Sequence, residues 1–354
     1  MDPVSQAALG AVVAHASAHR TLGVRALAMG AVAGGIPDLD VLWSLSGDSF
    51  DQMRMHRGIT HSLFFAPVVG PLLGYLAWRC EKRRGGTERL RAWVLALTLA
   101  LLSHPLLDLT TPYGTQLLQP FSDARFAIWA MSIIDPVYTV VLLAGVVVAW
   151  RRPHWRAASA TALGLSTAYL GYAWYLNEAA ADAARAQLRA EGVEHAEVAA
   201  FPTFLQVHYR RVVVRTDAEV LAGFVSMWRP CPIVWSAAPR LADATVAAWR
   251  DSREGRIFEW FAMGWVHHVP TDRGLVSADL RYGFSTDPAI SAFSTVAEFD
   301  EGGDLVRVMD AGRARPDFFS RGGLLANAYP GSCQAVSSAT PVQQIAASPA
   351  ATDA

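Results

Sequence analysis

The stretch FAIWAMSIIDPVYTVVLLAGVVVAW, residues 126–150, decides the class of fold. A run this apolar is long enough for one helix to cross roughly 30 Å of hydrocarbon. Three further apolar stretches occupy residues 62–78, 92–107 and 157–177. We therefore expect a mainly α, polytopic membrane domain with four transmembrane helices.

The composition of the whole chain points the same way. Hydrophobic residues make up 52% of its 354 residues, which is more than an ordinary soluble enzyme carries. The formal net charge of −1 lacks the basic excess of a nucleic-acid binder. Only three cysteines occur, without paired spacing, so any metal has to be bound by histidine and carboxylate.

Two shorter apolar pieces, about 6–18 and 24–36, precede the spans and suit a re-entrant hairpin. Basic residues then set the orientation, because short cytoplasmic loops collect Lys and Arg. The connections 79–91 and 151–156 are rich in arginine and should face the cytoplasm. The loops 37–61 and 108–125 should face outward.

The chain changes character after the last span. We predict a membrane domain over residues 1–177, a helical connector over 178–195, and a small β-rich or α+β domain over 196–333. Segments such as TFLQVHYRRVVVR, residues 203–215, are rich in β-branched and aromatic residues that favour strands. By the helix count this second domain is extracytoplasmic, and the tail 334–354 is disordered.

Charged and metal-binding side chains gather in the first outward loop. Asp38 and Asp40 form a D-x-D turn after Pro37, which either faces a divalent cation or is a solvated turn or helix cap. His56 and His61 are five residues apart, so on a regular helix they would face different ways. We interpret them as a loop residue and a first-turn residue that converge on one point, although a lone histidine is usually structural.

Two later positions should lie at the same membrane edge. His104 and Asp108 are one helical turn apart and share a face. They are two ligands, a ligand with its orienting carboxylate, or an isolated hydrogen-bonded pair. Asp135, beside Pro136 in the third span, is a metal ligand, a general base, or an N-cap before a proline at the first helical position.

The motifs GGIPDLD, HRGITHS, SHPLLDLTTPYGTQLLQPFS and IIDP resemble, in order and spacing, the YdjM-like membrane-bound metal-dependent hydrolases. The resemblance is strong over residues 1–150 and implies a bacterial inner-membrane location and a hydrolase-like metal site. Carried over by position, its motifs are Pro37, Asp38 and Asp40; His56, Arg57, Thr60, His61 and Ser62; and His104, Pro105 and Asp108. Where that family often begins with a Thr-His pair, this chain has Ser5 and Gln6.

Our leading hypothesis is a hydrolase that holds one or two divalent ions, zinc first and manganese as another option. The expected ligands are Asp38, Asp40, His56, His61, His104 and Asp108. Arg57 would hold an anionic group such as a phosphate, and Asp135 would act as base or further ligand. The expected substrate is a lipid or a lipid-linked phosphoester, with membrane lipids as partners and no nucleic acid. The rival hypotheses are a transporter or ion-pathway protein, and a structural or sensory protein with a structural metal.

Overall fold

The computed structural model describes residues 1–86, 89–193, 196–272, 274–312 and 327–329. The predicted disordered tail, 334–354, lies outside them. The chain divides into two compact units, Met1–Tyr172 and Ala173–Ala354. One helix, α7 (Arg156–Ala190), runs through the boundary, so the predicted last span and the predicted connector are parts of a single helix.

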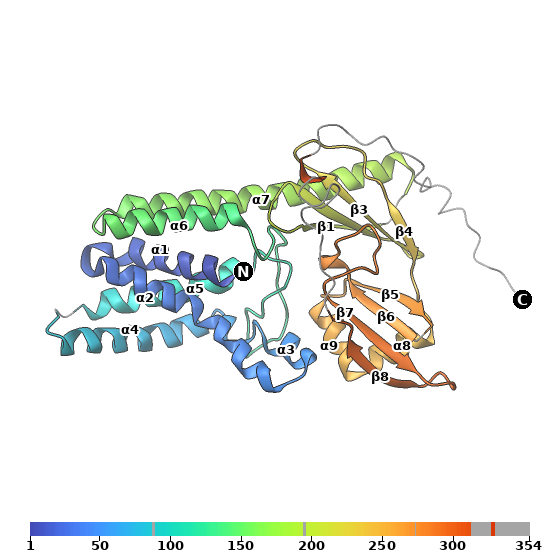
Figure 1. The fold of residues 1–354 in the computed structure, drawn as a ribbon, viewed down its shortest axis with the longest axis horizontal. Helices are drawn as coiled ribbons and strands as arrows, with labels where there is room; N and C mark the ends of the chain where they lie inside the picture. Colours follow the sequence, from blue (N-terminus) through green and yellow to red (C-terminus); the bar gives the residue numbers. More distant parts are fainter. Residues whose placement is uncertain (87–88, 194–195, 273, 313–326, 330–354) are drawn as a thin grey trace, which may run out of the picture. The chain divides into compact units, whose positions relative to one another are not determined.

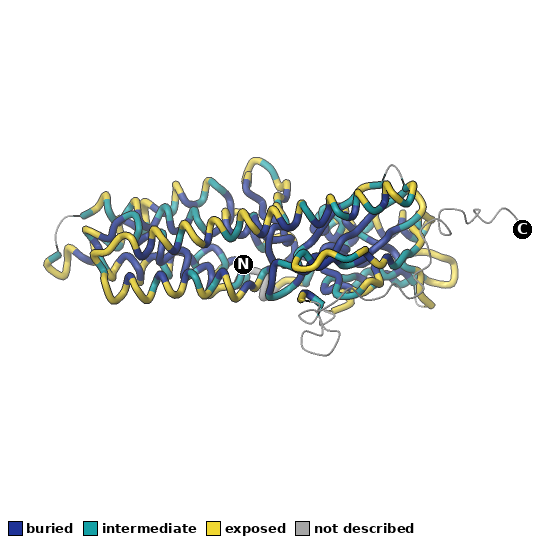
Figure 2. Tube along the Cα trace, turned by 90° about the horizontal axis from the view of Figure 1, so that it is seen from above, coloured by how far each residue is buried: buried dark blue, intermediate teal, exposed yellow. Residues whose placement is uncertain are grey.

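The first unit is a bundle of helices with short helical turns at one end (Figure 1). Its elements are α1 (Pro3–Leu22), α2 (Val24–Gly35), η1 (Pro37–Ser46), α3 (Ser49–Met55), η2 (Ile59–His61), α4 (Phe65–Arg83), α5 (Leu90–Asp108), α6 (Pro136–Arg151) and the first part of α7. Helix α1 packs against α2, α5 and α6. Buried positions follow the inward faces of these helices (Figure 2).

Small residues let the helices approach closely. A Cβ atom on Gly10 of α1 would overlap the carbonyl oxygen of Gly30 in α2. A Cβ on Gly74 of α4 would likewise overlap the backbone of Val94 in α5. Such small-residue contacts are typical of helices that associate in lipid, where van der Waals packing drives association.

We expect Gly10→Ala to destabilise the helical unit by about 1–3 kcal/mol, because the added methyl group has no room at the α1–α2 crossing. The measurement is the thermal midpoint of the full chain in detergent. Gly164→Ala is the matched control, because a Cβ there meets nothing within 4 Å. Equal midpoints for the two variants would contradict the close crossing.

Three short connections lie at the same end of the bundle. The turn between α1 and α2 lies next to the α6–α7 connection, because a Cβ atom on Gly23 would be 3.8 Å from Pro153 Cβ. His15 Nε2 of α1 also lies 2.9 Å from the carbonyl oxygen of Pro153. The guanidinium group of Arg89, just before α5, contacts the carbonyl oxygen of Thr21. The opposite end carries η1, η2 and the C-terminus of α5 (Figure 1). The two basic connections therefore share one end, and the suspected site residues lie at the other.

The described residues contain fewer candidate spans than the four expected. Among the described residues, Leu90–Asp108 alone is a single helix long and apolar enough to cross a membrane. A second candidate is the bent pair Ser49–His61 and Phe65–Arg83, with a 63° angle between its parts. Helix α6 is apolar but has only 16 residues, because it begins at Pro136 and leaves 126–135 irregular. Helix α7 lacks a sufficiently apolar stretch, since Ser, Thr and Tyr interrupt it.

Of the two apolar pieces expected to form a re-entrant hairpin, the first is longer than predicted, and the second ends one residue earlier. They form two packed helices, α1 and α2, joined at Gly23. Gly23 has a φ of 53°, in the left-handed region that glycine adopts at little cost. The first helix starts already at Pro3, with Asp2 as its N-cap.

The second unit is β-rich, as predicted, and contains two antiparallel four-stranded sheets. The first sheet has the order β1 (Glu197–Pro202), β2 (Tyr209–Arg215), β3 (Glu219–Ser226), β4 (Ser236–Pro239). The second has the order β5 (Val266–Thr271), β6 (Gly274–Asp279), β7 (Ser294–Phe299), β8 (Leu305–Asp310). Two helices, α8 (Ala244–Asp251) and α9 (Arg253–Phe261), and the turn η3 (Leu280–Tyr282) complete it.

The core of this unit explains its strand sequences. Ala184 and Leu188 from the second half of α7 pack with Val212 and Val214 of β2. The valine run of β2 is buried on both faces, so it reads as continuously apolar rather than alternating.

The second unit should lose stability in mild acid. Burial lowers the pKa of both His267 and His268 in β5 to about 4. Below about pH 6.5 these histidines bind protons in the unfolded chain, whereas in the folded chain they stay neutral until the pH approaches 4. Their contribution to the free energy of unfolding is therefore complete above about pH 6.5 and is lost as the pH falls toward 4. We expect up to about 3 kcal/mol per histidine, measured by near-ultraviolet circular dichroism of the full chain. His268→Gln should flatten the profile, and an unchanged profile would contradict the assignment.

Candidate metal centre

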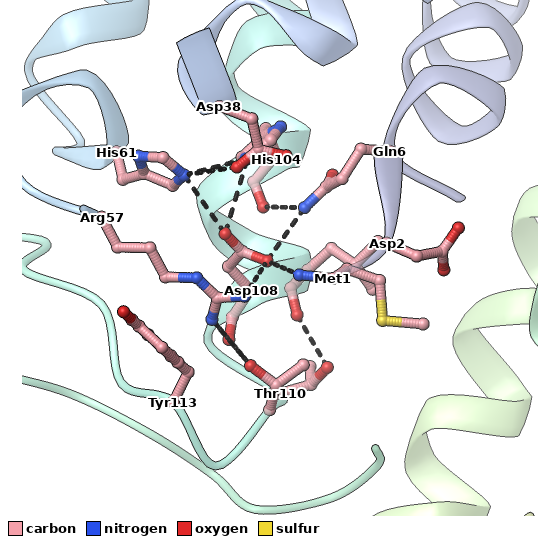
Figure 3. A network of polar contacts seen from close by, with 12 residues as sticks. Met1, Asp2, Gln6, Asp38, Arg57, His61, His104, Asp108, Thr110 and Tyr113 are labelled. Atoms are coloured by element: carbon pink, nitrogen blue, oxygen red, sulfur yellow. Dashed lines mark hydrogen bonds and ion pairs between the residues drawn. The ribbon is translucent and has the colours of Figure 1, made fainter. Parts of the chain in front are cut away.

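Four side chains from three helical segments meet at the end of the bundle. They are Asp38 from η1, His61 from η2, and His104 and Asp108 from α5. One ligand atom from each lies within 4.8 Å of all the others. Figure 3 shows the four side chains gathered together at this end of the bundle. Both histidines and Asp108 are buried, whereas the Asp38 side chain is 21% exposed.

The spacing of the four atoms suits a tetrahedral ion. Asp38 Oδ1 is 3.4 Å from the Nε2 atoms of both His61 and His104, and these two Nε2 atoms are 3.0 Å apart. Asp108 Oδ2 lies 3.3 Å and 3.4 Å from the same two nitrogens. A tetrahedron with metal–ligand bonds of about 2.0 Å has edges of about 3.3 Å.

The hydrogen-bond partners of the histidines leave both Nε2 atoms available as ligands. His104 Nδ1 donates to the carbonyl oxygen of Gly34, at 2.6 Å. His61 Nδ1 lies 3.0 Å from Thr60 Oγ1 and 3.3 Å from Asp40 Oδ2, so a proton on Nδ1 is held toward these oxygens. Partners of this kind fix the tautomer and orientation of metal-binding histidines.

The two oxygens of Asp108 have different surroundings. Oδ1 accepts from Gln6 Nε2 at 3.0 Å, pairs with Arg57 Nη2 at 3.1 Å, and contacts the amino group of Met1 (Figure 3). Oδ2 faces the histidines and is buried without a hydrogen-bond donor among the described residues. The four potential ligand atoms thus face one another, an arrangement that requires a cation or protons on the histidine nitrogens between them.

The carboxyl groups of η1 are ionised. Burial by itself would raise the pKa of Asp38, but hydrogen bonds with His104 and His61 outweigh it and hold that pKa well below its usual range. Burial opposes ionisation of Asp40 in the same way, and hydrogen bonds with His56 and His61 keep its pKa low. Both carboxylates therefore carry a charge that can pair with a cation.

Asp40 and His56, both expected as ligands, lie outside the group of four. Asp40 Oδ1 is 2.7 Å from His56 Nδ1, and its Oδ2 accepts from Arg57 N and Thr60 Oγ1 at 3.0 Å and 3.1 Å. Asp40 therefore orients His61 through one carboxylate oxygen, which also accepts from the loop backbone at Arg57. His56 contacts the other oxygen of Asp40.

Arg57 is buried between the site and the segment that follows α5. Its Nη1 donates to Thr111 Oγ1 at 2.8 Å, and its guanidinium group lies 4.7 Å from the centre of the Tyr113 ring. Its φ of 60° is unusual for a residue with a side chain and is a strain often found at functional sites. Because its Nη atoms are engaged with Asp108 and Thr111, Arg57 holds a ligand in place.

Asp135 lies apart from the group and caps α6. Its Oδ1 accepts from Tyr138 N at 3.0 Å, and Tyr169 Oη donates to its Oδ2 at 2.9 Å. Of the three roles that the sequence left open, the N-cap is the one the contacts describe.

Gln6 is the residue whose role the motifs did not reveal. Its amide group reaches Asp108 and the carbonyl oxygen of His104, the latter at 3.3 Å. The resemblance marked this position only as a departure from the histidine often found there. In this chain it supports a ligand by hydrogen bonding.

The first unit is thus a helical bundle with a buried group of histidines and aspartates at one end. The sequence profile of the YdjM inner membrane protein family matches residues 1–180, and the chain belongs to this family. This confirms the resemblance and the inner-membrane assignment.

Two relatives match part of the chain. The inner membrane protein YbcI of Escherichia coli (strain K12) is 43% identical over 115 residues, which cover 32% of this chain and 64% of the relative. The uncharacterized protein YfhP of Bacillus subtilis (strain 168) is 30% identical over 115 residues, 32% of this chain and 33% of the relative. The chain thus spans less than two thirds of the length of either relative. No solved structure matches.

Proposed function

We propose that this chain is an inner-membrane, metal-dependent hydrolase that acts on a lipid or another membrane-associated phosphoester or ester. The observation that carries the proposal is the group of four atoms, Asp38 Oδ1, His61 Nε2, His104 Nε2 and Asp108 Oδ2, in which each histidine nitrogen lies 3.0–3.4 Å from the other three atoms. Zinc is the first choice of ion, because it accepts mixed nitrogen and oxygen ligands at tetrahedral spacing. Manganese prefers six oxygen-rich ligands, which this group does not offer.

The metal would supply a water molecule acidified to near neutrality, and therefore a nucleophile without a reactive serine or cysteine. Other residues of the chain would hold the metal ligands in position. Gly34 and Asp40 orient the two histidines, and Gln6 and Arg57 hold the outer oxygen of Asp108. Asp38 is the ligand most accessible to solvent, so a substrate would approach from its side.

For the topology we propose four spans, with the site end outward and the β-rich unit extracytoplasmic. The location of both basic connections at the end opposite the site supports this orientation. Reporter fusions after residues 85, 118 and 200 test it. A cytoplasmic signal after residue 118 would overturn the proposed orientation.

A second candidate is a purely structural metal, and one observation favours it. Four protein ligands close a tetrahedral shell, whereas catalytic zinc sites usually keep one position for water. Such an ion would tie η1 and η2 to α5 without catalysing a reaction.

One experiment separates the two candidates. The full chain is purified in detergent, its bound metal is measured by elemental analysis, and it is assayed on a panel of lipid-like phosphoesters and esters. The hydrolase proposal expects turnover that His61→Ala abolishes together with bound metal, while Asp135→Asn keeps both. Stoichiometric metal without turnover on any substrate would overturn the hydrolase and favour the structural ion.

A further inference from the structure

An apolar cavity opens between α2, α4 and α5, and its polar end lies at the end of the bundle opposite the metal centre. Its volume is about 540 Å³, within the range of small-molecule binding sites. Most of its wall is apolar, and its long side chains include Met29, Val32, Ile36, Leu73, Leu76 and Leu97. A long hydrocarbon chain is the kind of group that such a wall accepts.

The cavity is polar at one end only. Arg25, Glu81 and Arg84 line that end, where the short connection between α4 and α5 begins. Glu81 is buried, and its carboxylate accepts from Arg25 Nη1 at 2.8 Å and from Trp93 Nε1 at 2.6 Å. The far end is formed by Ile36 at the end of α2. Between Arg25 and Ile36 the helix rises by about 16 Å, enough for most of an extended acyl chain.

The charges at the polar end favour an anionic head group. Arg25 neutralises Glu81, so Arg84 contributes an excess positive charge with an exposed side chain. The neighbouring connection 79–91 adds further basic residues. Basic pockets between membrane helices on the cytoplasmic side recognise acidic lipid head groups.

We propose that this cavity binds one anionic phospholipid, with its head group at Arg25 and Arg84 and an acyl chain lying along α2 toward Ile36. The reverse placement would bring the end of the hydrocarbon chain against the Arg25–Glu81 pair, which is unfavourable. The proposal does not depend on hydrolysis, because the head group would lie at the end of the bundle opposite the metal centre.

The test uses native mass spectrometry of the full chain in a mild detergent. The probes are phosphatidylglycerol and phosphatidylethanolamine with identical acyl chains. We expect one phosphatidylglycerol to be retained in preference to phosphatidylethanolamine. Arg84→Gln should weaken its retention about fivefold, as expected for one basic residue near an anionic head group. Arg83→Gln is the matched control, since it removes the same charge from an exposed residue of α4 that does not line the cavity.

A second pair of variants tests the acyl-chain part of the site. Ala28→Trp fills the cavity from α2 and should lower retention of phosphatidylglycerol, whereas Val68→Trp, on an exposed part of α4 outside the cavity, should not. Equal retention of the two lipids would overturn the proposal. So would equal losses in Arg84→Gln and Arg83→Gln, because they would indicate attraction by the general basic charge of this end.

Discussion

His104→Ala will abolish stoichiometric zinc binding by the full chain. The imidazole group supplies one of four atoms at tetrahedral spacing, and no other described histidine lies close enough to replace it. Loss of a partner that merely orients a ligand typically costs 10–100-fold in metal affinity, so we expect removal of the ligand itself to cost more than about 100-fold. Competition with a fluorescent zinc chelator, after metal has been stripped from the protein, measures the affinity.

Graded controls make this prediction specific. Asp40→Asn should lower the affinity by about 10–100-fold, because Asp40 orients His61 without belonging to the group of four. Asp135→Asn should leave the affinity unchanged, since its contacts are with α6 and Tyr169. If His104→Ala and Asp135→Asn bind zinc equally well, the site has been assigned to the wrong residues.

Arg57→Leu will destabilise the metal-free helical unit by about 3–5 kcal/mol, the usual cost of removing one partner from a buried ion pair. The substitution leaves the buried Asp108 with Gln6 and the Met1 amino group but without its guanidinium partner. Zinc should reduce the loss, because the ion neutralises part of the same carboxylate and stabilises the folded state by binding to it.

The thermal midpoint in detergent, with and without zinc, measures this effect. Arg54→Leu is the matched control, since Arg54 is an exposed arginine three residues earlier in the same segment. A loss as small as that of Arg54→Leu would show that Arg57 does not hold Asp108. A loss that zinc leaves unchanged would show that the ion does not bind at Asp108.

The positions of the helices could be predicted from hydropathy, but the number of helices that cross the membrane could not. The predicted ranges 62–78 and 92–107 lie within a few residues of α4 and α5. The third predicted helix, 126–150, was wrong at its start, because residues 126–135 are apolar but do not form a helix. Its Ala130 and Met131 are buried beside the segment that follows α5, and Ala130 N donates to the carbonyl oxygen of Thr110. Hydropathy cannot distinguish such a buried segment from a span.

The local geometry of each motif decided which site residues could be foreseen. His104 and Asp108 are one turn apart on a regular helix, so their common face was predictable. Asp38 and Asp40 were expected to share a face of an extended turn. They lie in a 3₁₀ turn with about three residues per turn, so residues two apart diverge, and Asp40 faces His56 instead.

The motifs indicated a role for Asp135 but gave none for Gln6. The proline after Asp135 already offered the N-cap as one alternative, and the hydrogen bond to Tyr138 N fits it. Gln6 carries no signal of its own in the sequence, because its contact with Asp108 joins residues far apart in the chain. Only the packing of α1 against α5 brings the two together.

X-ray absorption at the zinc edge of the reconstituted full chain tests whether the four side chains of the metal centre bind the ion. The account predicts one zinc per chain, bound by four nitrogen or oxygen atoms at about 2.0–2.1 Å, two of them from imidazole rings, and no sulfur ligand. The same spectrum should be absent from His61→Ala. Zinc bound with the same spectrum in His61→Ala, or a wild-type chain that binds no zinc, would contradict it.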